Sequence, residues 1–263
     1  MLYFLFQNET GYMLNHMGVL GTYVLGGNAL MLPIMLALTV LSLFIGYLLG
    51  SVNFAVLFSK KLYGEDVRDS GSGNAGFTNM MRSYGEKAAA YTFVGDFLKA
   101  ALAVMIGWML YGYMGAWSGA LGALLGHIFP LYYKFRGGKG VVCLTATILL
   151  LDWRIFVILF VIFMVAAVST RYISLGSILC AATLPLFVNR MYKATTTAEG
   201  IILDENTRLK WFVTTVALIM AVIVVVKHIG NIKRIANGTE SKFSFNKTKK
   251  TSDVNADGKD KQA

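Results

Sequence analysis

Apolar residues occur along this chain in long blocks that are separated by short polar stretches. The long blocks cover residues 30–58, 88–111, 116–133, 173–188 and 211–226. Blocks of about 20 apolar residues are long enough to cross a lipid bilayer as α-helices. A shorter pair, Val141–Leu151 and Ile155–Val168, fits either two short inclined helices or a re-entrant pair. The pattern predicts an all-α polytopic membrane protein with about seven transmembrane helices, or with five and a re-entrant pair.

The composition agrees with this prediction and argues against a single soluble domain. Of the 263 residues, 56% are hydrophobic and only 14% are charged, and the mean hydropathy is +0.59. The net charge of +10 is interpreted as a signal of membrane topology and of anionic lipids or substrates, rather than of nucleic-acid binding.

Lysine and arginine are divided unequally between two sets of polar segments. One set holds 17 of them and comprises residues 59–83, 134–139, 171 and 227–263. The other set holds five and comprises residues 1–29, 111–118, 152–154 and 189–210. Because positive segments stay in the cytoplasm, the N-terminus is predicted outside and the C-terminus inside.

Two flanking segments differ from the apolar body at residues 30–240. Residues 1–29 carry no lysine or arginine, so we expect an extracytoplasmic extension. Residues 241–263 are rich in Lys, Asp, Ser, Thr and Asn, a composition typical of a disordered basic tail in the cytoplasm.

A first polar cluster, Gly71–Asn79 with Arg82 after it, lies on the predicted cytoplasmic side. It offers three glycines, two hydroxyls, two amides and one cation. Glycines let a backbone approach an anion closely, hydroxyl and amide groups give direction, and arginine binds phosphate through two parallel bonds. The cluster therefore fits an oxyanion or polyol phosphate site; the alternative is an ordinary polar turn.

A second cluster, Gly126–Gly140, joins two apolar blocks and carries Lys139 among three glycines. Successive backbone N–H groups beside a helix N-terminus form a phosphate cradle. The spacing differs from a Walker A loop, since Gly140 replaces the hydroxyl residue that would bind magnesium. The alternative is a flexible basic turn.

A third cluster is split between two block ends. Thr170–Ser177 opens the block at 173, and His228–Arg234 closes the block at 226. His228 and Asn231 are three residues apart and can face one site. Asp96 and Lys99, inside the second block, can pair toward the protein interior. No zinc or paired-carboxylate pattern occurs, so neither a metal nor another cofactor is expected.

In this order and membrane setting, the clusters resemble those of the bacterial acyl-phosphate:glycerol-3-phosphate acyltransferases. The motifs read GSGNAGFTNMMR, GHIFPLYYKFRGGKG, and TRYISLGS with HIGNIKRIANGTE, and the similarity runs from about Leu43 to Glu240. Three positions depart from the family pattern. Ala75 stands where proline is usual, Phe77 where alanine is usual, and Ile229–Gly230 where a charged residue commonly follows the histidine.

The resemblance implies a reaction on the cytoplasmic face of a bacterial inner or plasma membrane. A fatty acyl group would pass from acyl phosphate to the sn-1 hydroxyl of glycerol 3-phosphate, giving 1-acyl-glycerol 3-phosphate (lysophosphatidate) and phosphate, the first step of phospholipid synthesis. The partners would be these two substrates and membrane lipids, without nucleic acid. The proton of the attacking hydroxyl would go either to a histidine or to the phosphate of the donor itself.

The resemblance also implies site residues. Those for glycerol 3-phosphate are Ser72, Arg82, Lys139, Ser174, His228 and Asn231. Those for acyl phosphate are Thr78, Asn79, Gly137, Gly138 and Gly140. Supporting roles fall to Asn74, His127 and Ser177. Ser177 competes with Ser174 for one role, and His127 fits either a base or a brace of its loop.

A membrane transporter of a phosphorylated small molecule is the rival function. It predicts polar residues through the depth of several helices and an internal repeat. Apart from Asp96 and Lys99, the polar clusters gather on one side, and no repeat is visible. The sequence therefore favours the acyltransferase.

Overall fold

The computed structural model describes residues 31–192, 196–197, 200–201 and 205–243. Its elements are α2 (Met31–Gly50), α3 (Phe54–Tyr63), η2 (Val67–Asp69), α4 (Phe77–Ile128), η3 (Leu131–Tyr133), α5 (Val141–Leu151), α6 (Trp153–Thr170), α7 (Ile173–Met191), β1 (Thr196–Thr197), β2 (Gly200–Ile201), α8 (Glu205–Lys227) and α9 (Ile229–Ala236). The predicted extension at 1–29 and residues 244–263 of the predicted tail lie outside the described residues.

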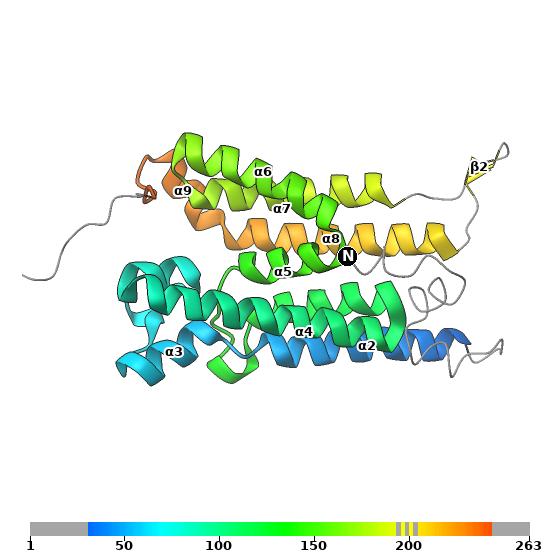
Figure 1. Cartoon of the computed structure of the whole chain (residues 1–263), viewed down its shortest axis with the longest axis horizontal. Coiled ribbons are helices and arrows are strands. Elements are labelled where there is room, and N and C mark those ends of the chain that lie inside the picture. Colours follow the sequence, from blue (N-terminus) through cyan, green and yellow to red (C-terminus); the bar gives the residue numbers. More distant parts are fainter. Residues whose placement is uncertain (1–30, 193–195, 198–199, 202–204, 244–263) are drawn as a thin grey trace, which may run out of the picture.

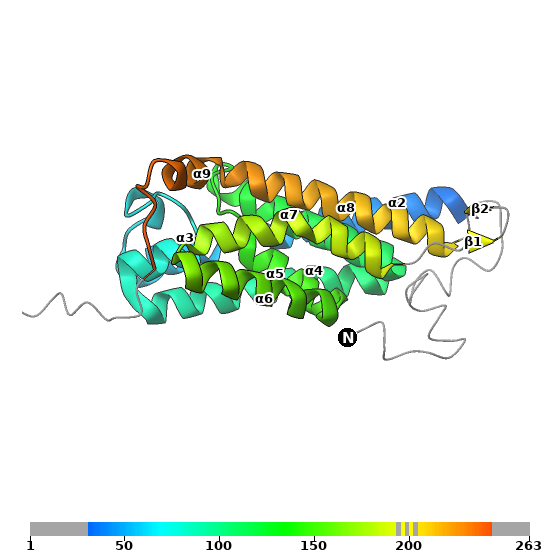
Figure 2. The same ribbon diagram turned by 90° about the horizontal axis from the view of Figure 1, so that it is seen from above.

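The long helices form one bundle and run along its length (Figure 1). α2 packs mainly on α4, α4 on α5, α6 on α7, and α7 on α8. The prediction of an all-α protein is confirmed, since the only strands in the described residues are the two-residue pair β1 and β2. This pair lies at one end of the bundle, while α3 and α9 lie at the other (Figures 1 and 2).

Five helices in the described part of the chain are long and apolar enough to cross a membrane. They are Pro33–Tyr63, Phe77–Tyr133, Trp153–Thr170, Ile173–Met191 and Thr207–Lys227. Of the shorter predicted pair, α6 has 18 residues, roughly 27 Å of helix, whereas α5 has only 11. α5 alone is therefore too short to span, and the number of crossings and the orientation stay predictions.

α4 is a long helical segment that is interrupted by breaks and folds back on itself. Its backbone leaves helical geometry first at Gly85, where φ is 83°, and again at Tyr111 and Gly112, where φ of the glycine is 47°. Beyond this second break the chain returns along the preceding turns. The two halves lie in backbone contact, as shown by Gly107, where an added Cβ atom would collide with the Gly115 carbonyl. The break lies where the sequence predicts the end of one apolar block, at residue 111.

Glycines bring α2 and the second half of α4 into backbone contact. A Cβ atom on Gly46 would strike the carbonyl of Gly119, and one on Gly122 would strike the carbonyl of Leu43. Small residues permit such close approach between membrane helices, where packing rather than water exclusion drives association.

The apolar block at 30–58 corresponds to one candidate span, Pro33–Tyr63, but it contains a turn that its apolar pattern did not predict. The chain turns at Ser51–Asn53 between α2 and α3. The buried Asn53 side chain caps α3 by accepting a hydrogen bond from the Val56 N–H at 3.0 Å. The turn also frees the Val52 carbonyl, which accepts a hydrogen bond from Lys99 Nζ at 2.6 Å.

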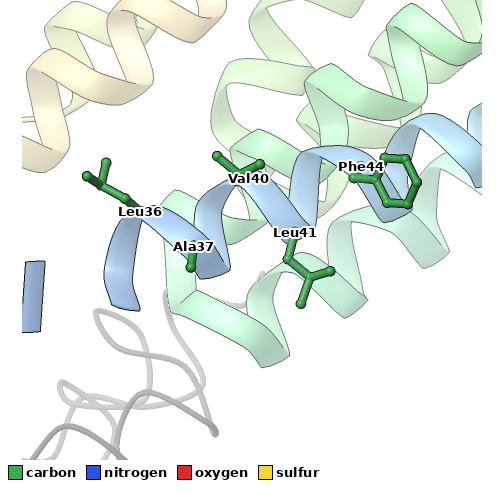
Figure 3. Close-up of a pocket in the computed structure, with 5 residues that line it drawn as sticks. All are labelled: Leu36, Ala37, Val40, Leu41 and Phe44. Atoms are coloured by element: carbon green, nitrogen blue, oxygen red, sulfur yellow. The ribbon is translucent and has the colours of Figure 1, made fainter. Parts of the chain in front are cut away.

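The outer face of α2 carries a shallow apolar pocket. Figure 3 shows its lining, which is Leu36, Ala37, Val40, Leu41 and Phe44. Of these, Leu36 is 58% and Val40 is 62% exposed. The buried residues of the same bundle include the charged Asp96 and Lys99, while these large apolar groups face outward as they do in a protein surrounded by lipid.

Candidate active site

Asn79 holds the first loop, residues 64–76 between α3 and α4, together from the inside. Its Oδ1 accepts a hydrogen bond from the Ser72 N–H at 2.8 Å, and its Nδ2 donates to the carbonyls of Val67 and Ser70 at 2.9 and 3.0 Å. The side chain is only 1% exposed. The sequence assigned Asn79 to the donor phosphate, but these bonds use its amide to fix the loop.

Three other predicted residues of this cluster present their side chains to solvent at the end of the bundle. Ser72 lies in the loop, and Thr78 and Arg82 lie on the first turns of α4, all exposed. No side chain caps the N-terminus of α4 at Gly76. Exposed donors beside an uncapped helix N-terminus are a suitable arrangement for an anion. Asn74, in the same loop, is half-buried.

The glycine turn of the second cluster packs on the end of α4. The Gly137 N–H donates to the Ile128 carbonyl at 3.2 Å, and the Gly138 N–H donates to the His127 carbonyl at 3.1 Å. Both N–H groups are therefore occupied within the chain in this structure, whereas the sequence predicted that they cradle a phosphate. The N-terminus of α5 remains, since Gly140 precedes it with φ of 81° and provides no side-chain cap.

Arg68 joins the first loop to the second loop, which comprises residues 129–140 between α4 and α5. Its Nη1 donates to the carbonyls of Tyr133 and Arg136 at 2.8 and 3.1 Å. Its Nε and Nη2 grip the Asp66 carboxylate at 2.9 and 2.7 Å. This interaction with Arg68 holds the pKa of Asp66 well below its usual range. Sequence reasoning missed Arg68, whose only signal was a position between two aspartates.

Lys139 connects the second cluster to the third. Its Nζ donates to Asn231 Oδ1 at 2.6 Å. The Nδ2 of Asn231 donates to Glu240 Oε1 at 2.6 Å, and Ser174 Oγ donates to the same oxygen at 2.7 Å. Arg234 Nε donates to Glu240 Oε2 at 2.7 Å. The structure thus brings together Lys139, Ser174 and Asn231 as predicted.

Glu240 was not named as a site residue, although it ends the third motif. Burial raises its pKa, but the hydrogen bonds from Ser174, Asn231 and Arg234 outweigh this effect and lower the pKa overall. The carboxylate is therefore ionised at neutral pH, and its three donors stabilise this one anionic group.

Positive charge is concentrated around Lys139. Burial lowers the pKa of Lys139 to about 8. The neighbouring cations of Arg234, Arg82 and Lys227 add to this effect, while the Glu240 carboxylate opposes it. Arg82 of the first cluster therefore lies within electrostatic reach of the Lys139 group. A cluster of cations that repel one another is relieved when a dianion binds.

His228 and Ser177 each hydrogen-bond to a backbone carbonyl four positions earlier in the chain. The Nδ1 of His228 lies 2.8 Å from the Val224 carbonyl, so Nδ1 carries the hydrogen and Nε2 is the acceptor in the neutral ring. Burial lowers the pKa of His228, which favours that neutral form. Ser177 is buried and its hydroxyl donates to the Ile173 carbonyl of its own helix, so Ser174 is the serine that faces the site.

Known proteins resemble this chain over most of its length. A chain from Carboxydothermus hydrogenoformans is 35% identical over 79% of this chain and 98% of its own, and one from Trichlorobacter lovleyi is 40% identical over 75% and 93%. Both are named glycerol-3-phosphate acyltransferase. One from Bacillus anthracis, glycerol-3-phosphate acyltransferase 3, is 37% identical over 81% and 98%.

Solved structures give the same result. The crystal structure of PlsY (YgiH), an integral membrane glycerol 3-phosphate acyltransferase, in its glycerol 3-phosphate form, matches with a TM-score of 0.66 and 28% identity, over 78% of this chain and 96% of that one. Its lysophosphatidic acid form matches with a TM-score of 0.64 and 25% identity, over 78% and 95%. The sequence profile of the family described as glycerol-3-phosphate acyltransferase covers residues 40–238. With its apolar helices and these matches, the chain is a multi-pass membrane protein and belongs to the glycerol-3-phosphate acyltransferase family.

Proposed function

We propose that this protein transfers a fatty acyl group from acyl phosphate to the sn-1 hydroxyl of glycerol 3-phosphate and releases lysophosphatidate and phosphate. The observation that carries the proposal is the linked group of Lys139, Asn231 and Ser174, with Arg234 bonded to the same Glu240 carboxylate and Arg82 within electrostatic reach. Hydrogen bonds join the second and third polar motifs directly, and the charge of Arg82 connects the first motif to them, at one end of an apolar bundle. A small dianion could bind there from the aqueous side, while the acyl chain lies among apolar side chains.

In the proposed reaction, the sn-1 oxygen forms a bond to the acyl carbon, and the bond from that carbon to the phosphate oxygen breaks. An acyl phosphate is already an activated anhydride, so no enzyme nucleophile is required. We favour the donor phosphate as acceptor of the hydroxyl proton, with the enzyme supplying position and charge stabilisation. A neutral His228, with Nε2 as acceptor, would orient the hydroxyl.

Each substrate is assigned part of the site. Glycerol 3-phosphate would be held by Lys139, Ser174, Asn231, His228, Arg82 and Ser72. Thr78 and the N-terminus of α5 after Gly140 would hold the donor phosphate, with Asn79 and the Gly137–Gly138 turn fixing the two loops. We place this site on the cytoplasmic face of a bacterial inner or plasma membrane, because Lys60, Lys61 and the other cations of the positive segments lie on that side of the predicted topology.

The proposal is tested with purified protein, synthetic acyl phosphate and labelled glycerol 3-phosphate. Acyl-CoA and acyl-carrier protein serve as comparison donors, and Lys139→Ala serves as the site control. We expect labelled lysophosphatidate from acyl phosphate alone. Product from the thioester donors but not from acyl phosphate would overturn the donor assignment.

A further inference from the structure

Three ionisable side chains meet in the interior of the bundle, away from solvent. Asp96 is 1% exposed, Lys99 is 5% exposed and His127 is 3% exposed. Lys99 Nζ lies 2.7 Å from Asp96 Oδ1 and 3.1 Å from His127 Nδ1. His127 Nδ1 also lies 3.5 Å from Asp96 Oδ1. We call Asp96, Lys99 and His127 the buried triad.

Stability alone does not account for the buried triad. Taking charges out of water is costly, and apolar residues of similar volume commonly replace a buried ion pair without loss of stability. Within the described part of the chain, Asp96 Oδ2 has no hydrogen-bond partner, so the carboxylate is incompletely satisfied. Ionisable groups at this depth in a membrane protein usually serve function.

The triad ends at the joint between the two polar loops. A Cβ atom on Gly138 would collide with His127 Nε2, and it would lie 2.6 Å from the Ala75 carbonyl oxygen. The imidazole edge therefore fills the space under Gly138, beside the backbone of the first loop. The same Gly138 donates its N–H to the His127 carbonyl. Lys139, which contacts Asn231, is the next residue along the chain.

The other end of the triad is tied to the start of α3. Lys99 Nζ donates to the Val52 carbonyl at 2.6 Å, in the turn between α2 and α3. The adjacent Asn53 donates from Nδ2 to the Ala75 carbonyl at 3.4 Å. The triad on α4 is thus connected to the first loop through Val52 and Asn53. It is connected to the second loop through His127 and Gly138.

We propose that Asp96 and Lys99 are positioning residues that fix the His127 ring beneath Gly138, and so hold Lys139 and the start of α5 in register with the first loop. The proposal rests on the function proposed above, which it extends to three residues that do not touch substrate. It assigns His127 the role of a brace rather than a base, because one ring edge contacts the ion pair and the other contacts backbone. Displacements of about 1 Å at such a support can cost a hundred-fold in rate.

The test uses a double variant, Asp96→Asn/Lys99→Met, which removes both charges with little change of volume. Hydrogen–deuterium exchange of peptides covering residues 134–144, the thermal midpoint Tm, and kcat and KM for both substrates are measured. Each single variant should lower Tm, because it leaves a buried charge without its partner. In the double variant we expect Tm to recover while the 134–144 peptides exchange faster and kcat/KM falls ten- to a hundred-fold.

Thr92→Val is the matched control. Thr92 is buried one turn before Asp96 on α4, and its hydroxyl donates only within its own helix, to the Ala88 carbonyl at 2.9 Å. This variant should retain wild-type exchange and kinetics. If the double variant does not fold, His127→Gln is judged by the same readouts, since it breaks the triad without leaving a charged lysine unpaired.

The outcomes separate the two proposals. A folded double variant or His127→Gln with wild-type exchange over 134–144 and wild-type kcat/KM would overturn the positioning role. Exchange needs no substrate, so it judges the triad even if wild-type protein fails to use acyl phosphate. That failure would instead overturn the proposed function.

Discussion

Lys139 Nζ donates a hydrogen bond to Asn231 Oδ1 over 2.6 Å, although 92 positions separate the two residues in the chain. Lys139 belongs to the glycine turn before α5, and Asn231 belongs to α9, which follows the last long helix. The contact joins the second polar cluster to the third. An ammonium group has three hydrogens, so Lys139 has others to donate to a ligand. Lys139 is therefore the residue through which binding of the substrate phosphate is best tested.

Lys139→Ala should raise the KM for glycerol 3-phosphate by about ten- to a hundred-fold. The reason is the loss of one charge-assisted contact to a dianion, worth roughly 1.5–3 kcal/mol. Steady-state kinetics at saturating acyl phosphate measure the effect. Lys134→Ala is the control, because Lys134 is an exposed cation of the same turn. An unchanged KM in Lys139→Ala would remove this lysine from the phosphate site.

The pH dependence of binding should follow the Lys139 charge. Because burial lowers its pKa to about 8, the ammonium is charged below pH 8 and loses its proton as pH rises through this value. Glycerol 3-phosphate is already a dianion there, since a phosphate monoester has its second pKa at about 6. His228 is neutral in the same range because burial lowers its pKa.

The KM for glycerol 3-phosphate should therefore rise by about ten-fold between pH 7 and pH 9, the change expected one pH unit above the pKa of the group. The measurement is a KM series from about pH 6.5 to 9.5. Lys139→Arg provides the comparison, because a guanidinium stays charged throughout. A rise of the same size in Lys139→Arg would assign the titration to another group.

Arg68→Lys should loosen the two loops even though it preserves charge. The lysine cannot grip the Asp66 carboxylate with two nitrogens while it also donates to the Tyr133 and Arg136 carbonyls. We expect a loss of about 1–3 kcal/mol in unfolding free energy, with a raised KM for glycerol 3-phosphate. Thermal unfolding in detergent and kinetics check this result. Arg136→Gln, which keeps the accepting carbonyl, should be nearly neutral in stability.

The sequence predicted the parts of the fold that depend on apolar length. α5 has the predicted bounds, Val141–Leu151, and the break in α4 at Tyr111 ends a predicted block. The ion pair of Asp96 and Lys99 was also predicted, since residues three apart share a helix face. These features depend only on the spacing of residues that lie close together in the sequence.

Features that depend on tertiary partners were not predictable. The turn at Asn53 interrupts a largely apolar block, and its partners come from α4 and from the first loop. Asn79 looks like any ligand in a polar loop until the loop folds around it. Glu240 and Arg68 are charged residues among other charged residues, and their distant partners alone distinguish them.

Gly138→Ala should reduce folding stability and activity together. The new Cβ atom would meet the Ala75 carbonyl and the His127 ring, and neither a backbone carbonyl nor a braced ring can move aside freely. Overpacking of this kind costs typically about 1–3 kcal/mol. Tm in detergent and kcat/KM for acyl phosphate measure the two effects.

Gly230→Ala is the control for Gly138→Ala, because its Cβ would meet only the end of the Arg234 side chain at 3.5 Å, so Tm should stay near wild type. The N–H of Gly138 already donates to the His127 carbonyl, so a direct role in holding the donor phosphate is not expected. If Gly138→Ala kept wild-type Tm and raised only the KM for acyl phosphate, the glycine would act through substrate approach. A joint fall of Tm and kcat/KM instead identifies Gly138 as the packing joint between the two loops, with Lys139 displaced as a consequence.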